Sequence, residues 1–76
     1  MFSHITTEMA ILGGKPCIKG TRISVEFILE LFANGATHET IIQSYPQLSA
    51  DALKEALDYA ARSLKNDILL TEEISV

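Results

Sequence analysis

The chain has 76 residues, of which 47% are hydrophobic, and a formal net charge of −4 at pH 7. It contains no run of about 18 apolar residues, which argues against a membrane-spanning helix, and its single cysteine excludes an internal disulfide. A chain of this length makes one domain and buries only about 60% of its unfolded surface. The high apolar content leads us to expect a homodimer, in which a second copy covers part of that surface.

We expect a cytoplasmic protein. The first ten residues lack the basic region and apolar core of a signal peptide, and one unpaired cysteine suits a reducing compartment.

The charge is unevenly distributed along the chain. Residues 1–22 carry a net charge of +2, whereas residues 23–76 carry −6, from three basic and nine acidic side chains. An acidic protein can bind nucleic acid only where its basic residues gather. Lys15, Lys19 and Arg22 form the one basic cluster in the sequence, and they are its candidate phosphate contacts.

The start of the chain predicts a β-hairpin. Residues 2–7 (FSHITT) are β-favouring with rough alternation and predict a strand, and residues 17–18 predict a second one. The two glycines at 13–14 signal a turn between them. A hairpin over roughly residues 4–18 follows, and its edges need covering, which the same strand of another chain would do.

A first helix is predicted between Ser24 and Gly35. Ser24 is a favourable N-cap, because its hydroxyl can accept a hydrogen bond from a free N–H of the first turn. Asn34 and Gly35 end the helix, since glycine readily takes the left-handed C′ conformation. Apolar side chains at helical spacing predict its buried face: Val25, Ile28, Leu29 and Phe32.

A second, shorter helix is predicted to start after Thr37, which is a good N-cap. Ile41 and Ile42 are its expected buried residues. Pro46 ends it, because the residue before a proline is disfavoured in the helical region.

The third predicted helix starts after Ser49, another N-cap, and runs to about Leu64. Its apolar stripe contains Leu53, Ala56, Leu57, Ala60 and Leu64. The side chains expected to face water are Asp51, Lys54, Glu55, Asp58, Arg62 and Lys65. Asp58 and Arg62 are four residues apart, in the favourable order for an ion pair.

These elements predict a mainly α fold: a three-helix bundle in a helix-turn-helix arrangement, preceded by a short β-hairpin and spanning residues 1–66. In a helix-turn-helix the last helix enters the DNA major groove, although three short helices are also the simplest small core. The leading face of the third helix has a net charge of −2, which disfavours phosphate contact. A protein-binding role therefore remains open beside DNA binding.

Residues 67–76 form an apolar C-terminal tail. Five of its ten residues are apolar, which is too many for a solvated segment. The tail is expected to fold back on the core or to dock on a partner, and the candidate partner-binding residues are Ile68, Leu69 and Leu70.

Catalysis is not expected. Gly13-Gly14-Lys15 lacks the glycine spacing of a phosphate-binding loop. Cys17 with His4 or His38 would need an orienting acid that the sequence does not indicate, and a buried thiol is the commoner role of cysteine. We expect no catalytic residue, no metal and no cofactor.

Residues 13–61, about two-thirds of the chain, resemble the domain-of-unknown-function-433 family. The residues that carry the resemblance are Gly13-Gly14-Lys15-Pro16, then Ile18-x-Gly20-Thr21-Arg22-Ile23-x-Val25, Gly35, Ile41, Tyr45-Pro46-x-Leu48 and Ala56-Leu57-x-Tyr59-Ala60. The resemblance implies a homeodomain-like helix-turn-helix and an antitoxin of the VapB type. Such proteins bind and inhibit a nuclease toxin with a PIN-like fold, and they repress their shared promoter as dimers.

The expected function is a DNA-binding antitoxin of a type II toxin-antitoxin system. Its candidate DNA-contact residues are Lys15, Lys19, Thr21, Arg22 and Lys54, and its tail would help to hold the toxin. The alternative is a protein-interaction module that binds a partner without binding DNA, which the acidic third helix favours.

Overall fold

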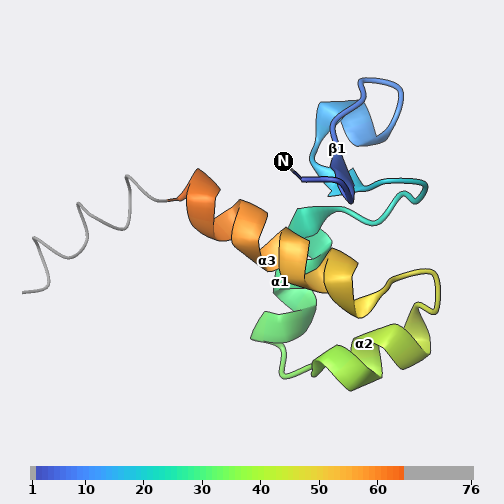
Figure 1. Ribbon diagram of the computed structural model, residues 1–76, viewed down its shortest axis with the longest axis vertical. Coiled ribbons are helices and arrows are strands. Elements are labelled where there is room, and N and C mark those ends of the chain that lie inside the picture. Colours follow the sequence, from blue (N-terminus) through green and yellow to red (C-terminus); the bar gives the residue numbers. More distant parts are fainter. Residues whose placement is uncertain (1, 65–76) are drawn as a thin grey trace, which may run out of the picture.

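A computed structural model describes residues 2–64 of the chain (Figure 1). In chain order the elements are β1 (Ile5–Thr6), the 3₁₀ turn η1 (Leu12–Gly14), β2 (Cys17–Ile18), α1 (Val25–Ala33), α2 (His38–Ser44) and α3 (Ala50–Ser63). Three helices preceded by a two-stranded antiparallel hairpin confirm the predicted fold class. The tail, with Ile68, Leu69 and Leu70, lies outside the described residues.

The hairpin is shorter than the sequence predicts. Ile5 pairs with Ile18 and Thr6 with Cys17, so the strand expected over residues 2–7 has two paired residues. Strand β2 offers only two partners before Gly20 turns the chain with a φ of +82°. Cys17 also bridges to Ser24, which joins the hairpin to the start of α1.

The predicted helix ends of α1 are confirmed. The Ser24 hydroxyl accepts a hydrogen bond from the Phe27 N–H at 2.9 Å. At the other end Asn34 is the C-cap and Gly35 follows with a φ of +96°, the left-handed conformation that a C′ glycine provides.

The other two helices also begin at the predicted caps. Thr37 caps α2 in a reciprocal arrangement with Thr40, whose hydroxyl accepts from the Thr37 N–H at 2.9 Å. The Ser49 hydroxyl accepts from the Ala52 N–H at 3.1 Å and starts α3. Tyr45 is the C-cap of α2, directly before Pro46, as the sequence predicts.

Helix α3 lies at the centre of the fold and packs against α1, α2 and β1 (Figure 1). Side chains from β2, the three helices and the turn before α3 form one hydrophobic core: Ile18, Val25, Ile28, Ile41, Leu48, Ala52, Leu53 and Ala56. Ala52 is a core residue that the predicted stripe lacked. Leu64 was predicted as buried, but it is 49% exposed because it lies at the C-cap, two turns beyond Ala56.

No helix within residues 2–64 is long and apolar enough to cross a membrane.

Candidate functional site

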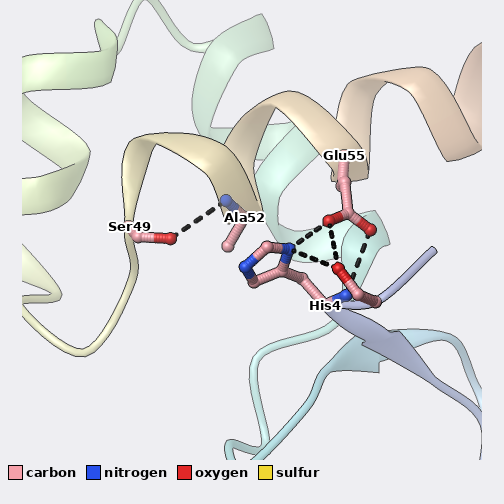
Figure 2. A network of polar contacts seen from close by, with 5 residues as sticks. His4, Ser49, Ala52 and Glu55 are labelled. Carbon is pink, nitrogen blue, oxygen red and sulfur yellow. Dashed lines mark hydrogen bonds and ion pairs between the residues drawn. The ribbon is translucent and has the colours of Figure 1, made fainter.

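The N-terminal segment meets the middle of α3 through a polar network (Figure 2). The His4 imidazole Nδ1 contacts the Glu55 carboxylate, and the His4 backbone N–H donates to Glu55 Oε1 at 3.1 Å. The Ser3 hydroxyl donates to Glu55 Oε2, also at 3.1 Å. The prediction that Glu55 faces water is wrong, since only 20% of its side chain is exposed.

These hydrogen bonds favour the ionised form of Glu55. The contact with the His4 ring, followed by the bond from the His4 backbone N–H, lowers the pKa of Glu55 below its ordinary value of 4.5. Glu55 is thus the acid beside a histidine that sequence reasoning missed. Cys17, the only thiol, is 0% exposed and packed in the core, so a substrate has no access to it. This network links the segment before β1 to the middle of α3.

The same segment continues along α3 towards its C-terminal end. The rings of Phe2 and Tyr59 meet edge to face, with their centroids 5.3 Å apart. The Arg62 guanidinium lies 5.9 Å from the Phe2 centroid, within the range of a cation–π contact. Arg62 also makes the predicted ion pair with Asp58, at 3.3 Å. Part of the surface of α3 is therefore covered by the N-terminal segment.

The N-terminal half of α3 is acidic. Asp51, Lys54 and Asp58 are exposed, and with His4 and Glu55 they line one shallow hollow. We call Asp51, Glu55 and Asp58 the acidic face. With histidine neutral, this hollow carries three negative charges and one positive charge. Such a surface repels phosphate and attracts cationic groups.

The predicted DNA-contact residues do not gather in one place. Lys15 pairs with Glu26 at 3.0 Å, with both side chains more than 60% exposed. The Thr21 hydroxyl donates to the Ile18 carbonyl at 2.8 Å and accepts from the Ile23 N–H at 3.0 Å. Thr21 therefore shapes the turn before α1, and its hydroxyl is already engaged there.

Four of these five residues line three different hollows. Lys54 lines the acidic hollow on α3, and Lys15 lines an apolar hollow between α1 and α3 that is described below. Thr21 and Arg22 line a separate hollow beside the loop before α1. The hollow lined by Thr21 and Arg22 also contains Gln47, from the turn between α2 and α3. Sequence reasoning missed Gln47, because only the fold brings the loop before α1 to the turn of the helix-turn-helix.

The hollow that Lys15 lines is mainly apolar. It has a volume of about 360 Å³ and lies between the start of α1 and the end of α3. Its apolar lining consists of Pro16, Val25, Leu29, Tyr59, Ala60 and Leu64. We call it the apolar hollow.

Across residues 2–64, no three His, Cys, Asp or Glu side chains lie close enough together to hold a metal ion.

Comparison with known proteins gives one consistent result. Residues 5–60 match the model of a family described as "Protein of unknown function (DUF433)". A protein of Sinorhizobium fredii, named uncharacterized protein y4eO, is 34% identical over 56 residues, which cover 74% of this chain. The chain spans only 25% of the length of that relative.

A solved structure agrees with the family match. The crystal structure of a DUF433 member from Anabaena variabilis superposes with a TM-score of 0.75 at 27% sequence identity. The alignment covers 96% of this chain and 69% of that one.

Proposed function

The chain belongs to the DUF433 family, and we propose that it is an antitoxin-like protein that binds and neutralises a PIN-like nuclease. The observation that supports this proposal is the acidic face of α3. A nuclease that handles RNA has a basic cleft, because it must attract phosphates. The acidic face offers such a cleft a surface of complementary charge.

The fold presents these carboxylates on a rigid element. Ser49 caps α3, and Ala52, Leu53 and Ala56 hold the helix in the core. Glu55 is fixed by three hydrogen-bonding contacts and is ionised at neutral pH. A preorganised charged surface loses little conformational freedom on binding, which favours a specific complex.

The test uses the product of the neighbouring reading frame, where it encodes a PIN-like nuclease. Association is measured by surface plasmon resonance at low and moderate salt, with Asp51→Asn/Asp58→Asn as the variant and Glu30→Gln/Glu39→Gln as the control. The control removes two exposed charges from α1 and α2. We expect the variant to associate about tenfold more slowly at low salt, with a smaller salt dependence. Equal slowing in both proteins would contradict a role for the acidic face.

Promoter binding is a second candidate function, supported by a different surface. Arg22 and Gln47 line the same hollow, and Lys19 is exposed in the same loop. In a homodimer this loop would occur twice, and each cation on a phosphate strengthens binding through counterion release. A gel-shift titration against the protein's own promoter tests it, and absence of binding at low salt would contradict it.

Neither role involves catalysis, and we propose that the chain is not an enzyme. Its only thiol is inaccessible, and His4 is held against Glu55. Hydrolase activity that depends on Cys17 or on either histidine would contradict this.

A further inference from the structure

We infer that the apolar hollow is the docking site of the chain's own C-terminal segment Ile68-Leu69-Leu70. This inference does not depend on the proposed function. It rests on three observations: the chemistry of the hollow, the point at which the chain leaves α3, and the composition of the residues that follow.

The hollow is built to receive apolar side chains. Val25 forms part of the core at 5% exposure, while Leu29, Tyr59 and Ala60 are half-buried around it. The charged residues at its edge, Lys15 and Glu26, are paired with each other. Contact with water at such a surface is unfavourable, and apolar side chains of suitable size would relieve it.

The chain leaves α3 at the edge of this hollow. Leu64 lines the hollow and is also the C-cap of α3, with 49% of its surface exposed. Each extended residue spans at most about 3.6 Å, so Ile68 can reach about 14 Å from Leu64 and Leu70 about 22 Å. The next strongly apolar residues of the sequence therefore lie within reach of the hollow.

A same-chain segment suits this hollow better than a second copy of the protein. A stable dimer interface involves about 20–30 residues on each partner, whereas nine residues line this hollow, whose volume of about 360 Å³ is the size of a small-ligand site. A short tether also gives the segment an effective concentration in the millimolar range, without any second molecule.

The experiment is solution NMR on the 76-residue chain with labelled methyl groups. We expect NOEs from the methyl groups of Ile68, Leu69 or Leu70 to the Tyr59 ring and to the methyl groups of Leu29. Ile68→Ser/Leu69→Ser/Leu70→Ser removes the methyl groups that give these NOEs and, if the segment docks, should shift the Tyr59 ring and Leu64 methyl signals. Ile74→Ser/Val76→Ser, which changes apolar residues of the same tail, should leave those signals in place.

Two results would overturn the inference. One is a Tyr59 and Leu64 spectrum that is the same in the triple variant and the wild type. The other is a set of tail-to-Tyr59 NOEs that survive isotope filtering in a mixture of labelled and unlabelled chains, because these would place the tail on a second copy. Ala60→Met provides a check from the side of the hollow: it should fill the space and weaken the same NOEs while Leu53 and Ile41 keep their shifts.

Discussion

The imidazole of His4 contacts the carboxylate of Glu55, although 51 positions of sequence separate the two residues. This contact connects the segment before β1 to the middle of α3 (Figure 2). The hairpin has only two residue pairs, and isolated hairpins of that kind are marginal in water. The link to α3 therefore contributes to holding the hairpin on the helices.

Glu55→Gln should lower the thermal unfolding midpoint at neutral pH. The pKa of Glu55 is lowered in the folded state by its contacts with His4, so the folded protein binds fewer protons than the unfolded one in the acidic range. The stabilisation is therefore complete above the ordinary pKa of 4.5 and is lost as pH falls through the lowered value. Circular dichroism melts from pH 7 to pH 3 should show the two proteins converging at the acidic end.

The control for this prediction is Glu30→Gln, which removes an exposed carboxylate from α1. The difference between its thermal unfolding midpoint and that of the wild type should change little over the same pH range. A Glu55→Gln protein whose deficit persists unchanged to pH 3 would show that the effect is not due to ionisation.

Ser49→Ala should destabilise the domain by about 1 kcal/mol, because the Ala52 N–H loses its acceptor at the start of α3. For a domain of this size that corresponds to a fall of about 4–8 °C in the melting temperature. Ser49→Asn is the matched control, since asparagine is an equally good N-cap and should melt close to wild type. An asparagine variant as unstable as the alanine variant would assign Ser49 a different role.

Local signals in the sequence predicted the helices well, because each signal acts within a few residues. The hydroxyls of Ser24, Thr37 and Ser49 cap the helices that they precede, and Gly35 takes the conformation expected of a helix end. The helical spacing also identified Leu53 and Ala56 correctly as core residues.

Long-range contacts were not predictable in the same way. Glu55 was expected to face water because it lies outside the apolar stripe predicted for its helix. Nothing near it in the sequence indicates His4 as its partner. Lys15, Lys19 and Arg22 are close in sequence, yet Lys15 turns towards Glu26 of α1 while Arg22 lies near Gln47. The candidate surfaces therefore depend on tertiary placement that one sequence does not specify.

Ile41 and Ile42 are neighbours whose different burial predicts different costs of mutation. Ile41 is 2% exposed in the core, whereas Ile42 is only half-buried. Ile41→Val should cost about 0.5–1.5 kcal/mol, because the removed methylene leaves a cavity. Ile42→Val should stay within about 0.5 kcal/mol of wild type. Urea unfolding midpoints measure both, and equal losses would contradict the placement of these two side chains.

If the promoter-binding role holds, the cations of the loop before α1 should determine its salt dependence. Each phosphate contact contributes about 0.9 to the slope of log affinity against log salt concentration. Lys19→Ala/Arg22→Ala should therefore weaken binding to all sequences and reduce that slope by about 2 for each loop that contacts DNA, and so by about 4 in a homodimer. Lys15→Ala should change it less, because Glu26 already neutralises Lys15 at the edge of the apolar hollow. A slope that falls equally with Lys15→Ala alone, or that the double variant leaves unchanged, would move the DNA contact away from this loop.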